Sequence, residues 1–538
     1  MAHHGFETYW VQGEGVLSEA GEGRVVAPVP VLADAAASMD SAVPPFRFSR
    51  MGPKGTGKQL GEPNHRRIAR AMTSGGGGFG NVPAGYTYLG QFVDHDLTFD
   101  KTSVALGENV PLAQLLQARS PSLDLDSLYG AGPGDPNSAK FYSDGMHLKM
   151  GKTDKIGPPP LQARDGFDLP RVGGSGSKKK QREALIPDPR NDENLAVAQT
   201  HLAMIRFHNR VVDSLPNAMP ATQKFATARD IVTRHYQWML RHDYLPRIAA
   251  PGVVSNVFNQ GRKAFEVGAD AMSIPTMPIE FSIAAFRLGH SMVREVYDWN
   301  AAFPSGNGTL DFLFTFSGLS GDFFGGVRLP SNWIADWRRL YDFKKEQNRN
   351  DLAPPGSVNK AMRIDTRLAP TLHFLRQSAT GDPTGGIHDD LAFRNLRRAR
   401  MVRLATGQQM VTFLKSKGVT VTKLTKAQLR DGKNGADLNN LTPGQRDGLF
   451  TNTPLWFYIL REAELNNGKL DGVGARIVAE TFHRAMEGST SSIVRDPAWR
   501  PNLGPNNTTF RMTDLLMFAF EGKKNLLAPL GDQLGGDI

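Results

Sequence analysis

The sequence predicts a mainly α fold, built as one large body with few short strands. Three observations carry this prediction. Apolar residues recur with helical spacing from residue 193 onward, candidate strands are few and short, and no convincing Pro- or Gly-rich linker divides residues 61–538. Length alone would suggest about three or four domains. We nevertheless expect a single domain at 61–538, preceded by an arm at 1–60.

The first 190 residues contain little sustained periodicity. Residues 1–60 are rich in Ala, Gly, Pro and Val, which indicates an extended arm packed on a larger body. The loop TSGGGGFGNVPAGY (73–86) then leads into an apolar stretch that contains GQFVDHDLTFD (90–100) and reads as a buried helix. Residues 101–190 read mostly as loop. Within them, KKKQR (178–182) follows GGSGS and indicates a mobile, solvated loop.

Helical patterns dominate the rest of the chain. Apolar residues recur at three- and four-residue spacing in five segments, which predicts a helix in each. These segments are ENLAVAQTHLAMIRFHNRVVDSL (193–215), FATARDIVTRHYQWMLRHDYLPRIA (225–249), FSIAAFRLGHSMVREVY (281–297), LAFRNLRRARMVRL (391–404) and GARIVAETFHRAM (474–486).

Composition limits the class of protein. The chain is 40% hydrophobic and 22% charged, as soluble globular proteins are. No apolar run reaches about 18 residues, so we expect no membrane span. No basic segment followed by an apolar stretch opens the chain, so we expect a cytoplasmic protein or one exported without a Sec-type signal. The chain has no cysteine, which excludes disulfides and thiolate ligands.

The net charge of +10 makes nucleic acid one possible partner. Because the basic residues are scattered, we expect no nucleic-acid binding and only a mild attraction for small anions. GPKGTGK (52–58) has the spacing of a phosphate-binding loop, but Gln59 stands where the magnesium-binding hydroxyl would be. We therefore interpret it as a chance Gly/Lys loop.

Three ionisable side chains stand in a row inside the first apolar stretch. His95 lies between Asp94 and Asp96, and large apolar residues surround all three. Bare charges in such a place cost several kcal/mol unless something compensates them. The sequence therefore predicts a compensating group for each.

Oxygen donors alternate along SPSLDLDSLYG (120–130). In an extended segment Ser120, Ser122, Asp124 and Asp126 would lie on one side. Clustered carboxylates repel one another unless a cation lies among them, and calcium takes about six to eight oxygen ligands. Asp96 could add a further carboxylate. Taken alone, the pattern is weak, and a solvated polar turn explains it better.

Two further signals are ambiguous on their own. Arg190 and Glu193 share a face if a helix has begun there, but Asp192 and Glu193 could simply favour the dipole at a helix start. His290 lies on a mostly apolar helix with Arg287 three residues before it. A lone buried histidine is usually a core residue with satisfied hydrogen bonds, and the alternative is a metal ligand.

In this order, GQFVDHD, SPSLDLDSLYG, PRNDEN and FRLGHS resemble the animal-type haem peroxidases, the peroxidase–cyclooxygenase superfamily that includes myeloperoxidase and lactoperoxidase. The resemblance covers roughly residues 60–500 and is greatest to the bacterial branch. It also takes in HYQWMLRHDYLPRI, MRIDTRLAP, NLRRARMVRLATGQ, TPLWFYILREAE and VGARIVAETF. It implies a large single-domain peroxidase fold, haem b, and calcium as a second cofactor.

The resemblance also implies roles for individual residues around the haem. His95 matches the distal acid–base histidine, Arg190 the distal arginine and Gln91 the distal glutamine. His290 matches the proximal ligand of the haem iron. Asn452, four residues before Trp456, falls where the family has the asparagine that accepts the proximal N–H.

The calcium ligands implied by the resemblance are Asp96, Ser120, Ser122 through its carbonyl, Asp124 and Asp126. The segment that holds them would fix the helix of His95.

Asp94 and Glu193 match the carboxylates that form ester bonds to haem methyl groups, and Arg287 matches an arginine that pairs with a propionate. Asp94 could then be neutralised as an ester and Asp96 by a cation, so the three adjacent charges need not coexist unpaired. Asn194 replaces the methionine of the myeloperoxidase sulfonium link, which predicts poor chloride oxidation.

The implied activity is oxidation of small donors by hydrogen peroxide through a ferryl haem. The donors would be bromide, iodide, thiocyanate, phenols or other organics. A fatty-acid (di)oxygenase of the same superfamily is an alternative, although Arg287 occupies the position of the cyclooxygenase radical tyrosine. A non-enzymatic haem protein used for adhesion or binding is a second alternative, and it would need neither His95 nor Arg190.

Overall fold

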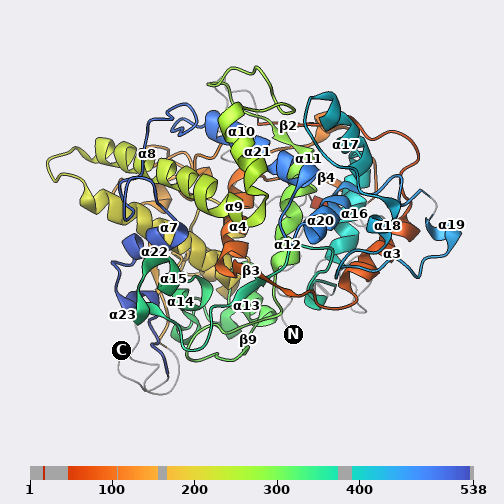
Figure 1. Cartoon of the computed structure of the whole chain (residues 1–538). Helices are drawn as coiled ribbons and strands as arrows, with labels where there is room; N and C mark the ends of the chain where they lie inside the picture. Colours follow the sequence, from red (N-terminus) through yellow and green to blue (C-terminus); the bar gives the residue numbers. More distant parts are fainter. Residues whose placement is uncertain are drawn as a thin grey trace.

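The computed structural model describes residues 16–18, 46–105, 107–155, 166–373, 390–446 and 448–533 (Figure 1). The protein is mainly helical, with 46% helix and 8% strand, which confirms the predicted fold class. Most of the predicted arm at 1–60 lies outside the described residues. None of the helices in the described ranges has the length and apolar character that a membrane crossing requires.

Ten helices of eight residues or more form the frame of the described part. They are α3 (Glu62–Thr73), α4 (Gly85–Leu97), α7 (Leu195–Ser214), α8 (Ala221–Met239), α10 (Pro251–Gln260), α16 (Leu391–Met401), α17 (Gly407–Ser416), α20 (Leu455–Leu465), α21 (Gly472–Glu487) and α22 (Met512–Ala519).

Shorter helices connect them. The α-helical ones are α5 (Asp126–Tyr129), α6 (Lys178–Arg182), α9 (Leu245–Ile248), α11 (Ile279–Ser282), α12 (Gly289–Met292), α13 (Leu310–Thr315), α14 (Trp337–Leu340), α15 (Phe343–Gln347), α18 (Lys426–Arg430), α19 (Pro443–Arg446) and α23 (Lys524–Leu527). Among the 3₁₀ turns are η4 (Pro189–Asp192), η6 (Ala285–Leu288) and η10 (Pro370–His373), and η5 (Leu240–Tyr244) is a π-helix.

In the described ranges the strands are short and form only two-stranded sheets. Parallel pairs join β1 (Val16–Ser18) to β4 (Ser103–Ala105) and β2 (Phe48–Ser49) to β7 (Met277–Pro278). Antiparallel pairs join β3 (Phe79–Pro83) to β10 (Lys360–Met362), β5 (Gly151–Lys152) to β6 (Phe167–Asp168), and β8 (Val296–Tyr297) to β9 (Gly308–Thr309).

Helix α4 lies in the middle of the molecule (Figure 1). It contacts α7 and η4 on one side and α12 on the other. Eleven of its thirteen residues are buried, which is what a helix with apolar residues all round requires. Its central place means that a side chain on α4 can face several different elements.

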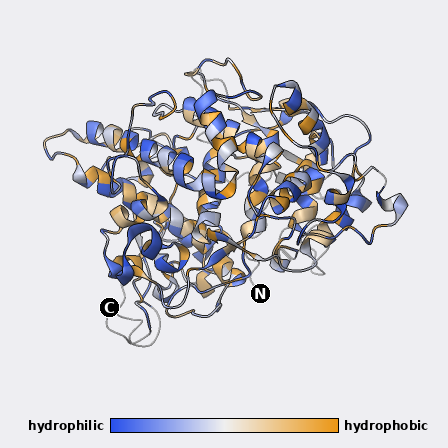
Figure 2. Cartoon of the chain, viewed as in Figure 1, coloured by the Kyte–Doolittle hydropathy of each residue, from blue (hydrophilic) through white to orange (hydrophobic). Residues whose placement is uncertain are grey.

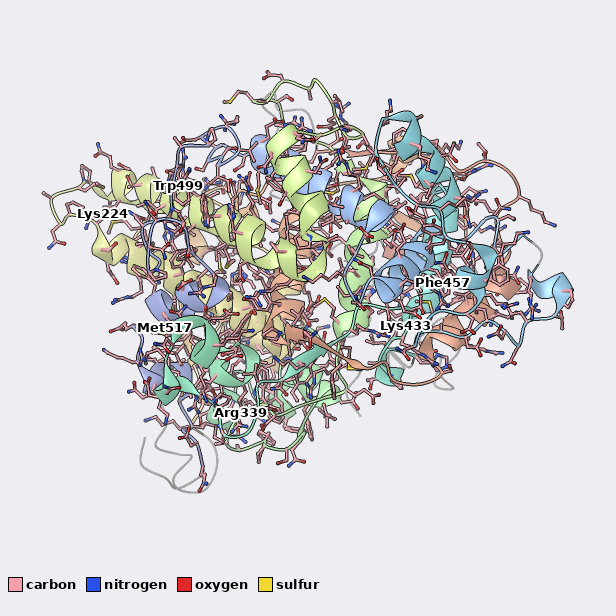
Figure 3. The ribbon with its side chains drawn as sticks, viewed as in Figure 1. Lys224, Arg339, Lys433, Phe457, Trp499 and Met517 are labelled. Atoms are coloured by element: carbon pink, nitrogen blue, oxygen red, sulfur yellow. The ribbon has the colours of Figure 1, made fainter. Side chains whose placement is uncertain are left out.

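Local features of the sequence determine where the helices beside α4 begin and end. The Asn194 side chain accepts a hydrogen bond from the Val197 N–H and begins α7. Helix α8 has hydrophilic and hydrophobic faces (Figure 2) and runs directly into the π-helix η5. Side chains fill the space between the ribbons, and Lys224 lies toward the outer end of α8 (Figure 3).

Three local predictions need correction. The segment 281–297 is not one helix but the short pieces α11, η6 and α12. The basic run at 178–182 is the short helix α6, begun by Ser177, whose hydroxyl accepts from the Lys180 N–H. The oxygen-donor run at 120–126 is a series of bends rather than an extended strand. The predicted helices at 193–215, 391–404 and 474–486 are confirmed as α7, α16 and α21.

Candidate active site

A cavity separates α4 from the η6–α12 segment. Gln91, Asp94 and His95 line it from α4, and Arg287 and His290 line it from the opposite side. The other lining residues are Thr87, Tyr88, Gly90, Asn194, Tyr244, Phe286, Gly289, Val293, Leu310, Phe314 and Leu372. The structure therefore brings the two predicted histidines, which are far apart in the chain, to opposite walls of one space.

The proximal side of the cavity is organised by His290. Its Nδ1 lies 3.0 Å from the amide of Asn395 on α16, and no described residue forms a hydrogen bond with its Nε2. Because an amide presents a donor or an acceptor depending on its rotation, the Asn395 oxygen can accept the Nδ1–H. The Nε2 lone pair is then directed away from Asn395 and is available to a metal.

This contact corrects the prediction for Asn452. The amide at His290 belongs to Asn395, and Asn452 lies half-buried in the turn before α20. A residue four positions before Trp456 would share its face only if the helix extended back that far, but α20 begins at Leu455 after Pro454. Trp456 does reach the site: its ring lies edge-on to His290, with 6.3 Å between centroids.

The distal side is organised by His95, which is 4% exposed. Its Nδ1 lies 2.9 Å from Asn191 Oδ1, and its Nε2 lies 3.5 Å from Glu193 Oε1. Burial lowers the pKa of His95 to about 3, and the positive charge of Arg190 acts in the same direction. The imidazole is therefore neutral at physiological pH, as a proton acceptor must be.

Arg190 is not among the side chains that line the cavity. It is fully buried beside His95, with Nη2 donating to the His95 carbonyl at 2.9 Å. Asp188 accepts from its Nε at 3.0 Å and from Nη2 at 2.6 Å, and the guanidinium lies over Phe99. Nη1 has no hydrogen-bond partner among the described residues. Arg190 thus hydrogen-bonds the backbone at His95, and its Nη1 donor has no partner among the described residues.

Gln91 connects three elements at the edge of the cavity. Its Nε2 donates to Glu193 Oε1 in a short hydrogen bond, and its Oε1 accepts from Asn194 Nδ2 at 2.9 Å. Glu193 is fully buried, and its Oε2 has no partner in the described part of the chain. Burial raises the pKa of the Glu193 carboxyl well above its usual range, so a reaction or contact that removes its charge would stabilise it.

The three adjacent ionisable residues of α4 do not share one environment. Asp94 and His95 both line the cavity, and His95 Nδ1 also contacts Asn191. Asp96 is fully buried and turns toward α5, where its Oδ1 accepts from the Ser127 hydroxyl at 2.8 Å. Their charges are therefore not stacked against one another.

Asp96, which is buried, forms a cluster of three carboxyl groups with the half-buried Asp124 and Asp126. Asp96, Asp124 and Asp126 each have one buried oxygen without a hydrogen-bond partner among the described residues. Burial raises the pKa of Asp124 to about 7, and the nearby Asp126 carboxylate adds to the shift. The pKa of Asp96 is raised for the same reasons. Unpartnered hard oxygens of this kind fit calcium.

The serines of the predicted calcium segment contact this cluster. Ser120 donates from its hydroxyl to Asp124 Oδ2 at 3.1 Å and from its N–H to Asp126 Oδ2 at 3.1 Å. The Ser122 carbonyl accepts from the Asp124 N–H at 3.0 Å. In the described ranges, however, no group of three or more acidic or histidine side chains stands close enough together to hold an ion. Binding would have to draw the carboxylates inward.

A charge network joins the carboxyl cluster to the distal side. Arg119 Nη2 lies 2.6 Å from Asp188 Oδ2, and its Nη1 lies 3.4 Å from Asp126 Oδ2. Asp188 therefore contacts both Arg119 and Arg190, and these two arginines hold the pKa of its buried carboxyl well below the usual range. A displacement of the carboxyl cluster would reach Arg190 through three ion pairs, Asp126–Arg119, Arg119–Asp188 and Asp188–Arg190.

Sequence reasoning missed several residues of the site. Asn191 and Asn395 hold the two histidines, and Tyr88, Tyr244 and Phe314 line the cavity. One signal was available for Asn395: it stands on the buried face of α16, where an amide needs a partner. Tyr244 was not predictable, because it ends the π-helix that changes the register after α8.

The chain is similar to known haem peroxidases. A family model described as animal haem peroxidase matches residues 106–488. Heme peroxidase 2 of Caenorhabditis elegans is 26% identical over 193 residues, 35% of this chain and 26% of that protein. Thyroid peroxidase of Canis lupus familiaris is 35% identical over 223 residues, 37% of this chain and 22% of that protein. The chain thus matches only about a quarter of the length of these relatives.

A solved structure shares the fold. Peroxidase A from Dictyostelium discoideum superposes with a TM-score of 0.57, covering 91% of this chain and 95% of that one at 15% identity. The family match includes Arg190, His290 and Asn395, whereas α4 with His95 precedes it. Since the family model covers well over half of the residues, this chain belongs to the animal haem peroxidase family, whose members bind haem.

Proposed function

We propose that this protein is a haem peroxidase that uses hydrogen peroxide to oxidise small donors such as bromide, iodide, thiocyanate and phenols. One observation carries the proposal: His95 and His290 face the same cavity from opposite walls, each held by a buried asparagine. A site that only bound haem would need an axial ligand but no neutral base across from it.

The residues present fit a haem. His290 offers one nitrogen, Nε2, that no described residue engages, while Asn395 holds the other. At Gly289, beside His290 in the cavity wall, a side-chain carbon would meet nothing within 4 Å. Arg287 adds a positive charge suited to a propionate. When bound, the haem would supply the iron that reacts with peroxide and the oxidising capacity passed to the donor.

The chain's own residues would manage the protons and charges. His95, neutral at physiological pH, takes a proton from peroxide and returns it to the leaving oxygen. Arg190 Nη1, a buried donor beside His95 without a described partner, would stabilise charge on that oxygen. Asn395 Nδ2 faces His290 Nδ1 in the structure; with the amide turned so that Oδ1 faces the ring, Asn395 would accept the Nδ1–H and raise the basicity of the ligand.

The proposal also includes a calcium site and ester bonds between the protein and the haem. The three unpartnered oxygens of Asp96, Asp124 and Asp126 support calcium. Glu193 Oε2 is likewise unpartnered, and Asp94 lines the cavity. An ester at Glu193 would fix the neutral state that burial favours, and an ester at Asp94 would remove a carboxylate from the cavity wall.

The test compares two histidine variants with the wild-type holoprotein. We expect wild type to show a Soret band and to oxidise iodide and a phenol with peroxide. His290→Ala should lose haem, whereas His95→Ala should keep haem and react with peroxide about 10²- to 10⁴-fold more slowly. Equal loss of haem in both variants would contradict the assignment, and fully folded wild type that binds no haem would refute the function.

A halide series tests the donor class. Asn194 cannot form the sulfonium link that a methionine could, and its side chain caps α7 and donates to Gln91. We therefore expect bromide and iodide to be oxidised in steady-state assays and chloride to be oxidised poorly. Chloride turnover equal to that with bromide would contradict this. Oxygenation of a fatty acid without peroxidase activity would favour the dioxygenase alternative.

A further inference from the structure

His95, Asn191 and His201 form a line of three buried polar side chains that leads away from the cavity. His95 Nδ1 lies 2.9 Å from Asn191 Oδ1, and Asn191 Nδ2 lies 3.0 Å from His201 Nδ1. The three residues come from α4, η4 and α7, and none is more than 4% exposed. His201 Nε2 has no hydrogen-bond partner in the described part of the chain. The peroxidase chemistry described above assigns no role to His201.

The orientation of the Asn191 amide decides what His95 can do. An amide has one accepting end and one donating end. With Oδ1 toward His95, the ring must carry its proton on Nδ1, which leaves Nε2 bare and able to take a proton. With the amide reversed, His95 Nδ1 must accept, so Nε2 carries the proton and cannot act as a base.

His201 opposes that reversal. Its Nδ1 accepts from Asn191 Nδ2, so its own proton lies on Nε2. If Asn191 rotated by itself, its oxygen would face the lone pair of His201 and its NH₂ would face the N–H of His95. Both imidazoles would have to change tautomer together. The His201 ring is also held edge-to-face against Phe92, with 5.7 Å between centroids.

We propose that Asn191 and His201 are positioning residues that fix His95 as the Nδ1-protonated tautomer, with Nε2 free to accept the proton of peroxide. This inference rests on the proposed peroxidase function and deepens it. Neither residue lines the cavity, so neither touches the reacting atoms. The pair acts on the reaction only through His95.

Four variants separate this role from a general effect of burial. Asn191→Leu removes both hydrogen bonds at similar volume, and Asn191→Asp keeps an acceptor toward His95. His201→Phe removes the acceptor for Asn191 but keeps a ring against Phe92. Gln199→Leu is the matched control, because Gln199 is a buried amide on the same helix whose Nε2 has no described partner.

The first measurement is the rate at which each haem-loaded variant reacts with hydrogen peroxide in rapid mixing. We expect Asn191→Leu to be slower by about tenfold or more, since general acid–base catalysis contributes about 10²- to 10⁴-fold. His201→Phe should fall between it and wild type. Asn191→Asp and Gln199→Leu should stay within about threefold of wild type, and KM for the donor should not change in any variant.

The second measurement needs no haem. In haem-free protein labelled with ¹⁵N-histidine, the His95 resonances report which ring nitrogen carries the proton, and His95→Gln identifies them. We expect protonated Nδ1 in wild type and Asn191→Asp, and a mixture of tautomers in Asn191→Leu and His201→Phe. If Asn191→Leu fails to fold, both the rate and the tautomer can still be measured in His201→Phe and Asn191→Asp.

The outcomes distinguish the two levels of proposal. A wild-type holoprotein that does not react with peroxide would refute the proposed function, yet the tautomer measurement would still decide the roles of Asn191 and His201. Wild-type rates and an unchanged His95 tautomer in the Asn191 and His201 variants would overturn the inference. Equal slowing in Gln199→Leu would also overturn it, because burial alone would then explain the effect.

Discussion

Replacing Asn395 by leucine removes the hydrogen-bond partner of His290 at nearly constant volume. Asn395 is 2% exposed and lies 3.0 Å from His290 Nδ1, so no water can easily take its place. Leaving a buried donor unpaired costs about 1–3 kcal/mol. At about 1.4 kcal/mol per tenfold, that cost corresponds to about 5- to 150-fold in affinity.

The expected result is therefore weaker haem binding. Haem-free protein is titrated with haem, and the Soret absorbance gives Kd. Asn395→Leu should raise Kd by about 10- to 100-fold, the usual effect of losing a partner of a metal ligand. Asn395→Asp, which can still accept the Nδ1–H, should stay close to wild type.

Asn452→Leu is the matched control, because Asn452 lies half-buried before α20 and has no recorded contact with His290. It should leave Kd within about twofold of wild type. If Asn452→Leu weakened haem binding and Asn395→Leu did not, the proximal assignment would be wrong. Unchanged binding in both variants would show that His290 needs no amide partner.

Three further predictions concern the carboxyl groups of the calcium segment, those near the cavity, and one half-buried histidine, His373. Removing calcium with a chelator should lower the free energy of unfolding by up to about 4 kcal/mol if calcium had been present at 1,000 times Kd. Asp124→Asn should reduce that loss, and identical melting with and without chelator would exclude a calcium site. After cycling with peroxide, acidified solvent should fail to extract the haem from wild type but should extract it from Asp94→Val/Glu193→Ala; free extraction from wild type would contradict the ester links. The hydrogen bond that His373 Nδ1 donates to the Asp390 carboxylate raises the pKa of His373 above its ordinary 6.5. The protonated ring therefore stabilises the fold below that value, and the stabilisation is lost as pH rises through the raised pKa. As pH rises through the raised pKa, the free energy of unfolding measured with urea should fall by about 0.5 kcal/mol after allowance for solvent screening. His373→Gln should show no such fall. A fall in the free energy of unfolding on acidification instead would contradict the prediction.

The sequence by itself determined the helical class and the chemistry of the site. Its three- and four-residue apolar spacing predicts α7, α16 and α21, because residues at that spacing lie together on the side of a helix that packs against the core. The row Asp94–His95–Asp96 required a compensating group for each, because three adjacent charges cannot be buried together without compensation. In the structure Asp94 and His95 both line the cavity, where Asn191 holds the His95 ring, and Asp96 turns away toward Ser127.

Only the tertiary structure decided which side chains meet. His290 and Asn395 are 105 positions apart, and His95 and Asn191 are 96 apart. Periodicity along one helix carries no information about which helices lie beside it. The sequence therefore offered only the distance to Trp456 for predicting the amide partner of His290, and that distance wrongly indicated Asn452 instead of Asn395. The break of segment 281–297 into short pieces likewise follows from packing around the cavity, because apolar spacing records which face is buried but not whether the backbone stays continuous.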